Sequence, residues 1–210
     1  MTVPEEAPVA FIIDDDATVR ESLADLLRSV GLAVRTFGST REFLDSKRPN
    51  SPGCIVLDIR LPGGSGLEFQ SSLAGSGIDL PVIFITGHGD IPMSVRAMKS
   101  GAMEFLTKPL REQELLDAVY LGIERDHVRR RQAKRVAELQ ERVASLTARE
   151  HEVLALVMRG RLNKQIAHEL QLSETTVKVH RGQIMRKMSA ASLVDLVRMA
   201  GYLGVLPDCS

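Results

Sequence analysis

The chain has 210 residues, of which 44% are hydrophobic and 26% charged, so it has enough apolar material for one or two folded domains and is not a disordered chain. Its 27 Lys/Arg balance 27 Asp/Glu, but residues 1–124 hold 11 basic and 18 acidic side chains, and residues 125–210 hold 16 and 9. The acidic half suits a bound cation and the basic half suits nucleic acid, although oppositely charged halves also arise when domains dock electrostatically.

Two cysteines, Cys54 and Cys209, are too few for a disulfide framework. The N-terminal segment MTVPEEAP lacks the basic and apolar regions of a secretory signal, and no apolar run approaches membrane-spanning length. We therefore expect a cytoplasmic protein without a membrane partner.

Short apolar runs alternate with helical patterns through the first 123 residues. Strands are predicted at residues 9–13, 32–37, 54–57, 81–85 and 104–106. Helices are predicted after each strand, from near residue 17 to Gly31, at 40–47, at 66–73, from Asp90 as a cap to Lys99, and from Glu112 onward. Five strands that alternate with five helices predict an α/β domain, a doubly wound parallel sheet with helices on both faces.

Polar side chains follow four of these strands. Asp14 and Asp15 follow the first, Asp58 the third, Thr86 the fourth, and Lys108 the fifth. The carboxyl ends of parallel strands meet at one edge of the sheet, where ligands bind. Three carboxylates brought together repel one another, and a divalent cation with oxygen ligands, such as Mg²⁺, relieves this repulsion.

Asp58 is then a candidate nucleophile toward phosphorus. Lys108 would neutralise charge on a transferring phosphoryl group, and the Thr86 hydroxyl could donate a hydrogen bond to its oxygen. Each residue alone has an ordinary alternative, because a strand-end Asp or Thr often shapes a turn and a Lys is often a solvated charge. Their joint placement favours phosphoryl transfer.

The segments FIIDDDATVR, VLDIRLPGGSG, VIFITGHGD and AMEFLTKPL resemble, in order and spacing, the receiver domains of bacterial two-component response regulators. The segment GHGDIPMSVRAMKSGAMEFLTKP is similar to the FixJ/StyR-like branch of that family. The resemblance implies a receiver domain of flavodoxin-like strand order over residues 8–123. It also implies that Asp58 accepts a phosphoryl group from a sensor histidine kinase.

The same resemblance implies roles for residues at or beside the strand ends. These are the Mg²⁺ ligands Asp15, Asp58 and the backbone carbonyl of Arg60, with Asp14 acting through water, the phosphoryl contact Lys108, and the switch pair Thr86 and Phe105. The bond between Lys108 and Pro109 would be cis.

From Glu112 an amphipathic pattern runs to Ser145 with Gly122 as its weak point. We predict that residues 124–145 form a helical linker, in which Arg129–Arg131 is a solvated face. The alternative is a short linker coiled coil, because apolar residues fit an a/d seam over two heptads. These residues are Val136, Leu139, Val143 and Leu146.

A second, all-α domain is predicted over residues 146–210. Thr147 and Glu150 form a capping box before an apolar helix that Gly160 ends. A short helix from Asn163, a tight turn, and a longer helix capped by Ser173 then make a helix-turn-helix arrangement, followed by a helix at 193–202.

The longer helix has one apolar and one polar face. At 100° per residue Val177, Ile184 and Met188 point inward, and Lys178 lies at the border of the opposite face. That opposite face carries Thr175, Val179, Gly182 and Arg186. A protruding, partly basic face suits a DNA major groove, although short helical hairpins also occur in ordinary bundles.

The segment LTAREHEVLALVMRGRLNKQIAHELQLSETTVKVHRGQIMRKM resembles the LuxR/NarL-type four-helix output domain. The resemblance implies that Lys178 and Val179 face the groove, that Gly182 replaces a long base-reading side chain of some members, and that the last helix dimerises or closes the domain core. It makes further residues candidates for phosphate or base-edge contacts, namely Asn163, Lys164, Thr176 and Arg186.

Together these features predict a response regulator rather than an enzyme. Phosphorylation of Asp58 would drive homodimerisation and sequence-specific DNA binding, with RNA polymerase as a further partner. The alternative is a haloacid-dehalogenase-type Mg²⁺-dependent phosphatase, which also uses a strand-end Asp, a Ser/Thr and a Lys. Such enzymes keep an acid two residues after the nucleophile, where this chain has Arg60. A degenerate receiver with constitutive DNA binding would not need the complete acidic set.

Overall fold

The computed structural model describes residues 7–62, 64–87 and 91–203. The chain divides into two compact units, the first ending at Arg130 and the second beginning at Arg131. Within the described residues, no helix is both long and apolar enough to cross a membrane. The predicted helix cap Asp90 and the cysteine Cys209 lie outside the described residues.

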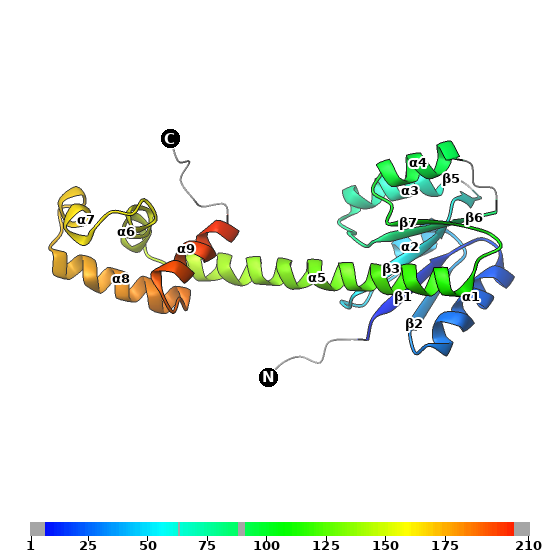
Figure 1. Ribbon diagram of the computed structural model, residues 1–210, viewed down its shortest axis with the longest axis horizontal. Helices are drawn as coiled ribbons and strands as arrows, with labels where there is room; N and C mark the ends of the chain where they lie inside the picture. The colour runs from blue at the N-terminus through cyan, green and yellow to red at the C-terminus, as the bar shows by residue number, and fades with distance from the viewer. Residues whose placement is uncertain (1–6, 63, 88–90, 204–210) are drawn as a thin grey trace. The chain divides into compact units, whose positions relative to one another are not determined.

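The first unit contains the predicted parallel sheet (Figure 1). Its strand order is β2-β1-β3-β6-β7, and every neighbouring pair is parallel. This order confirms the doubly wound, flavodoxin-like fold. The strands are β1 (Val9–Ile13), β2 (Ala33–Phe37), β3 (Gly53–Asp58), β6 (Val82–Thr86) and β7 (Glu104–Thr107).

Helices cover both faces of this sheet. Phe11 and Ile13 of β1 pack into one core cluster, and Ala10 and Ile12 pack into the other, because successive side chains of a strand point to opposite faces. The first cluster includes residues of α2 (Thr40–Asp45), α3 (Gly66–Leu73) and α4 (Ile91–Lys99), and the second includes residues of α1 (Ala17–Ser29) and α5 (Glu112–Ala144). Burial on both faces explains why β1, β3 and β6 are nearly continuous apolar runs, whereas the edge strand β2 carries the exposed residues Arg35 and Thr36.

Two short features were not predicted. A hairpin of β4 (Arg60–Leu61) and β5 (Gly64–Ser65) follows β3, and the 3₁₀ turn η1 (Ala74–Ser76) follows α3. Strands of two residues are too short to show the alternation that identifies a strand in a sequence.

The first unit extends into α5 beyond residue 123 through a buried carboxylate. Asp126 is fully buried and accepts hydrogen bonds from the Gly53 amide at 3.0 Å, from Arg129 Nη2 at 2.6 Å and from Arg130 Nε at 2.7 Å. We call these four residues the Asp126 network. The interpretation of Arg129 and Arg130 as a solvated face is therefore wrong, because both arginines bind a buried acid of the same helix.

Gly122 lies where α5 crosses β3. A Cβ atom at this position would be 2.9 Å from Cys54 Cβ and 3.3 Å from Met103 Cε. The predicted weak point of the helix is thus a place where only glycine lets the helix approach the strand this closely.

The second unit is helical (Figure 1). After the last turns of α5 come α6 (Ala148–Met158), α7 (Asn163–Glu169), α8 (Glu174–Met188) and α9 (Leu193–Tyr202). Thr147 and Glu150 form the predicted capping box, and the Ser173 hydroxyl accepts a hydrogen bond from the Thr176 amide at the start of α8. Gly160 follows α6 with φ +73, the left-handed conformation that favours glycine.

Part of the predicted coiled-coil seam is buried within the second unit. Leu139 is buried, and Val143 and Leu146 belong to the helical core. Arg142 Nη1 donates to the Met188 carbonyl at 3.1 Å. These contacts favour the helical linker over the coiled coil, because Val143 and Leu146 of the seam already pack against residues of their own chain.

Glu150 joins three segments of the second unit. Its carboxylate accepts hydrogen bonds from the Thr147 amide at 2.7 Å and from Lys187 Nζ at 2.6 Å. The Lys187 hydrogen bond, followed by the amide hydrogen bond, lowers the pKa of Glu150 from 4.5 to about 2. The ionised Glu150 carboxylate therefore stabilises the folded second unit. This contribution is fully present above pH 4.5 and is lost as the pH falls toward 2.

We expect Glu150→Gln to lower the stability of the second unit at neutral pH and to flatten its loss of stability between pH 4.5 and 2. Hydrogen exchange of the α6 and α8 amides in the full-length protein measures both effects. Equal slopes against pH for the variant and the original protein would contradict this assignment.

Candidate functional site

Backbone hydrogen bonds continue the sheet pairing past the strand ends and place the candidate residues. The Asp14 amide donates to the Phe37 carbonyl at 3.3 Å, and the Lys108 amide donates to the Thr86 carbonyl at 2.8 Å. Asp58 pairs in register with Ile85, the residue before Thr86. The polar residues that follow these strands therefore meet at one edge of the sheet.

Lys108 contacts two of the three carboxylates directly. Its Nζ lies 2.8 Å from Asp14 Oδ2 and 2.7 Å from Asp58 Oδ2. Asp14 is fully buried and Asp58 is 7% exposed, so these charge-assisted hydrogen bonds lie in a largely dry environment. The Lys108–Pro109 bond is cis, which confirms the expectation from the resemblance.

The pKa shifts of Asp14 and Lys108 follow from their burial and their hydrogen bonds. Burial raises the pKa of Asp14, and the hydrogen bonds from Lys108 and the Asp16 amide offset the rise only in part. Burial alone would lower the pKa of Lys108, but its hydrogen bonds to Asp14 and Asp58 outweigh that effect and raise it. The ammonium therefore stays charged beside the carboxylates.

Three carboxylates form a cluster that fits a cation. Asp14, Asp15 and Asp58 each offer an oxygen, and these oxygens lie within 4.8 Å of one another. Asp15 is exposed, which leaves the cluster open to solvent on one side. An all-oxygen, incompletely closed donor set suits Mg²⁺ better than a soft metal.

The remaining predicted residues surround this cluster. The Arg60 amide donates to Asp58 Oδ1 at 3.0 Å, and the β4–β5 hairpin holds the chain that follows. Thr86 is fully buried at the end of β6. Phe105 is half-buried on β7, pairs in register with Phe84 and packs against the core. The structure thus gathers the acids, Lys108 and the end of β6, while Phe105 lies one strand further along the sheet.

Two nearby roles were not predicted. Arg20 Nη1 donates to the Asp14 carbonyl at 2.6 Å, which ties α1 to the first strand end. Asp16 caps α1 by accepting hydrogen bonds from the Thr18 and Val19 amides at 2.8 and 3.3 Å. The third acid of the DDD run is therefore a helix cap, as an aspartate just before a helical pattern could have indicated.

The faces of α8 agree with the predicted helical wheel. Val177 is fully buried, and Ile184 and Met188 are each 1% exposed. The residues predicted to face outward are exposed, namely Thr175, Lys178, Val179, Gly182 and Arg186. A Cβ atom at Gly182 would meet no atom within 4 Å.

The other candidate DNA contacts differ in whether their side chains are hydrogen-bonded to other residues of the chain. Lys164 is exposed at the start of α7. Asn163 Oδ1 accepts a hydrogen bond from Arg181 Nη1 at 3.0 Å, and the Thr176 hydroxyl lies 2.8 Å from the Ser173 hydroxyl. Arg186 donates to Gln183. Among the described residues, Lys178 of α8 and Lys164 of α7 thus have no side-chain partner, whereas Asn163, Thr176 and Arg186 are held by neighbours.

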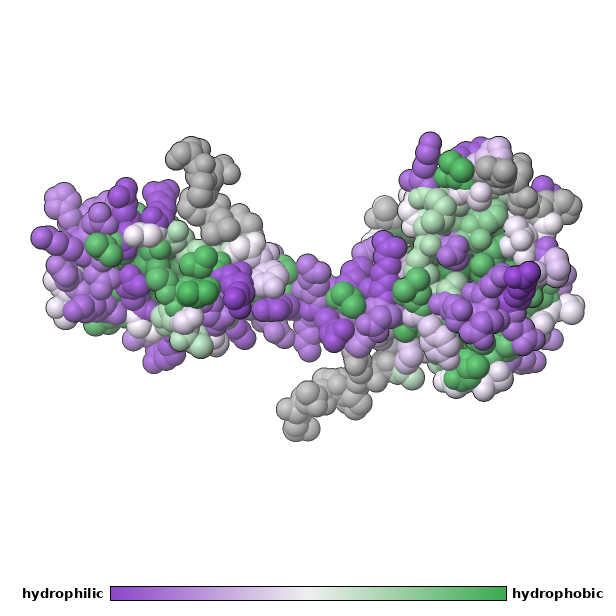
Figure 2. All heavy atoms as spheres, in the orientation of Figure 1, coloured by the Kyte–Doolittle hydropathy of each residue, from purple (hydrophilic) through white to green (hydrophobic). Residues whose placement is uncertain are grey.

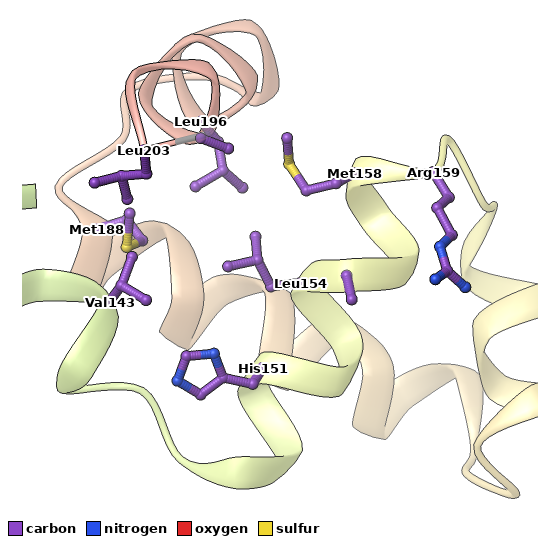
Figure 3. Close-up of a pocket in the computed structure, with 10 residues that line it drawn as sticks. Val143, His151, Leu154, Met158, Arg159, Met188, Leu196 and Leu203 are labelled. Carbon is purple, nitrogen blue, oxygen red and sulfur yellow. The ribbon is translucent and has the colours of Figure 1, made fainter. Parts of the chain in front are cut away.

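The second unit also contains an apolar pocket of about 370 Å³. Figure 3 shows Leu154 and Met158 of α6, Met188 of α8 and Leu196 of α9 around this pocket. Met188 belongs to the buried face of α8, so the pocket lies away from the exposed, partly basic face.

Hydrophilic side chains cover most of the visible surface of each unit, with smaller hydrophobic patches between them (Figure 2). Helix α9 contributes several exposed apolar residues, of which Val194 is 68% exposed. The others are Leu193 at 43%, Val197 at 40% and Tyr202 at 44%. The same helix places Leu196 and Ala200 in the interior, so it closes the core and still presents apolar surface.

Comparisons with known proteins match both units. The family model of the response regulator receiver domain matches residues 10–120, and that of the luxR family of bacterial regulatory proteins matches residues 144–200. Nodulation protein W of Bradyrhizobium diazoefficiens is 54% identical over 94% of this chain and 87% of its own. Response regulator protein TodT of Pseudomonas putida is 50% identical over 95% of this chain and 88% of its own.

Solved structures give the same result. The response regulator StyR aligns with a TM-score of 0.83 and 50% identity, over 93% of this chain and 98% of that chain. Full-length FixJ from B. japonicum aligns with a TM-score of 0.57 and 37% identity, over 97% and 100% of the two chains.

Proposed function

Because the chain belongs to the response regulators that join a receiver domain to a LuxR-type DNA-binding domain, we propose that Asp58 is its phosphoryl acceptor and α8 its DNA-reading helix. Its relatives are transcriptional regulators, and a receiver implies a histidine kinase as partner. The phosphatase alternative has no support among these relatives.

The contact of Lys108 with Asp14 and Asp58 is the observation that carries this proposal. The Lys108 ammonium lies between two strand-end carboxylates, and it can exchange its hydrogen bonds to them for one to an incoming phosphoryl oxygen. Asp58 also differs in exposure from the other two acids of the cluster. It is 7% exposed, whereas Asp14 is fully buried and Asp15 is exposed. It therefore combines a dry site with access for a small group.

In the proposed transfer, a carboxylate oxygen of Asp58 forms a bond to phosphorus while the bond between phosphorus and the imidazole nitrogen of phosphohistidine breaks. The imidazole leaves with the bonding electron pair, and Asp58 becomes an acyl phosphate. Lys108 compensates charge on the phosphoryl oxygens, and the Thr86 hydroxyl donates to one of them.

Mg²⁺ would be held by Asp15, Asp58 and the Arg60 carbonyl, with Asp14 acting through water, because the oxygen cluster fits a hard cation. When bound, the metal supplies positive charge that neutralises the carboxylates and the phosphoryl oxygens. The protein contributes the orientation of these groups through the hydrogen bonds of Asp14 and Asp58.

The proposed switch links this site to dimerisation. When Thr86 moves toward the phosphoryl group, Phe105 gains room to turn inward, which remodels the surface of α4, β7 and α5. Pairing of two such surfaces would bring two DNA-binding units onto one operator at high effective concentration. RNA polymerase would then be recruited by the bound dimer.

The test is phosphorylation of the full-length protein by acetyl phosphate with Mg²⁺. We expect a single acid-labile phosphoryl group on Asp58, a shift to dimers in sedimentation, and tighter operator binding. Asp58→Asn should abolish all three. An acid-stable phosphoserine, or labelling that persists in Asp58→Asn, would refute the assignment of the acceptor. Tighter DNA binding by a protein that stays monomeric would refute dimerisation as the switch.

The assignment of α8 is tested with Lys178, whose side chain is exposed on that helix. Lys178→Ala should weaken operator binding more than non-specific binding by about 1–3 kcal/mol if the residue reads a base. Lys134→Ala removes the same charge from an exposed position of α5 and serves as the control. Equal losses for operator and random DNA would reduce Lys178 to a phosphate contact.

A further inference from the structure

A separate cavity lies at the amino ends of β3 and β6, the edge of the sheet opposite the carboxylates. Its volume is about 170 Å³. Two loops and α5 line it, and the lining includes the three arginines Arg48, Arg129 and Arg130. A cavity of this size holds more than single waters and is open to small polar molecules.

Arg48 is held in place by the end of α2. Its Nη1 donates to the Phe43 carbonyl at 3.0 Å and to the Ser46 carbonyl at 3.3 Å, and its guanidinium lies 5.2 Å from the centre of the Phe43 ring. The Nε and Nη2 groups of Arg48 have no protein partner within the described residues. A fixed guanidinium with spare donors loses little conformational entropy on binding an anion.

The other two arginines are fixed by the Asp126 network. Arg129 Nη1 also contacts Asp79 Oδ2 at 3.0 Å, and Arg130 Nη1 donates to Asn50 Oδ1 at 2.8 Å. Three guanidinium groups thus stand against the two carboxylates of Asp126 and Asp79. One positive charge remains uncompensated at the cavity, and Nη2 of Arg130 has no partner within the part of the chain that the structure describes.

A buried hydroxyl completes the site. Ser51 lines the cavity, is 3% exposed, and its Oγ has no hydrogen-bond partner among the described residues. Buried hydroxyls in proteins are normally hydrogen-bonded, so an orphan beside a cavity indicates a partner that occupies the cavity. Pro49 and Pro52 restrict the loop on both sides of this serine.

We propose that this cavity binds a compact tetrahedral oxyanion of the phosphate class. The guanidinium groups approach from two segments of the chain, the loop before β3 and helix α5, and Ser51 adds a neutral donor. A tetrahedral anion with several acceptor oxygens can use donors from several directions, whereas a planar carboxylate suits one guanidinium fork. The bound anion would join α5 to the loop before β3 and thereby stabilise the first unit.

The experiment is calorimetric titration of inorganic phosphate into the full-length protein without Mg²⁺ and at constant ionic strength. Acetate is titrated as the planar comparison. Arg48→Gln should weaken phosphate binding about tenfold or more, and Ser51→Ala about fivefold, as expected for the loss of a charge-assisted and a neutral hydrogen bond. Acetate should bind more weakly than phosphate.

Arg41→Gln is the matched control, because Arg41 lies in α2, shortly before Arg48 in the sequence, and its side chain is 92% exposed. It should leave phosphate binding unchanged. Ser51→Ala should not destabilise the phosphate-free protein, because its hydroxyl has no partner there, but it should reduce the rise in Tm that phosphate produces. If Arg48→Gln does not fold, Arg48→Lys keeps the charge without the fork and should still weaken binding. Unchanged phosphate affinity in the Arg48 and Ser51 variants, or acetate binding as tight as phosphate, would overturn the proposal.

Discussion

Replacing Asp126 with alanine is expected to lower the free energy of unfolding of the first unit by about 3–5 kcal/mol. The carboxylate is fully buried and accepts hydrogen bonds from Gly53, Arg129 and Arg130. Its loss leaves the buried Gly53 amide without an acceptor, leaves Arg130 without its counter-ion, and leaves Arg129 with only Asp79. These consequences cost free energy only in the folded state.

Urea unfolding of the full-length protein, followed by circular dichroism, measures this effect. Asp117→Ala is the control on the same helix, because Asp117 is exposed and contacts only Gln113 among the described residues. The control should change stability by no more than about 0.5 kcal/mol. Asp126→Ala with a stability equal to that of the control would show that the network contributes nothing to the fold.

The second large effect concerns Gly122 and Gly182, two glycines inside helices at which helix propensity alone predicts the same effect of an alanine substitution. Gly122→Ala should destabilise the first unit by about 1–3 kcal/mol, because the new Cβ would lie 2.9 Å from Cys54 Cβ in a packed interior. Gly182→Ala should stabilise the second unit by about 0.5–1 kcal/mol, because its Cβ enters open space and alanine favours the helix.

Each glycine variant is the control for the other, since helix propensity alone predicts stabilisation at both positions. Thermal unfolding of the full-length protein, with hydrogen exchange to assign each change to its unit, separates the two effects. Stabilisation by Gly122→Ala would mean that α5 can move away from β3 at little cost. Destabilisation by Gly182→Ala would mean that α8 needs glycine for a reason other than space.

The strand ends could be predicted because parallel strands all present their carboxyl ends at one edge. Once the apolar runs are assigned as parallel strands, Asp14, Asp58 and Lys108 must lie at the same edge of the sheet. This conclusion does not depend on how the helices pack against the sheet. The switch residue Phe105 shows the limit of this logic. Its position on β7 follows from the sequence, but its half-buried packing depends on neighbours that no local pattern specifies.

The Asp126 network could not be predicted for a related reason. The segment ERDHVRRR alternates charges as a solvated helix face does, and its contact with Gly53 joins residues 73 positions apart. Gly122 was equally ambiguous, because a glycine within a helix can mark either a weak point or a close approach. Only the three-dimensional arrangement distinguishes these alternatives.

The position of the Asp126 network bears on how this chain could be recombined with others. This chain joins a receiver domain to a LuxR-type domain, and a graft of either onto another protein works only if it keeps the contacts that its own residues make. A receiver ending at residue 123 would lose the acid that satisfies the Gly53 amide, whereas one ending at Arg130 would retain it. A junction that keeps this network intact therefore lies inside α5, directly after Arg130, the last arginine that binds Asp126.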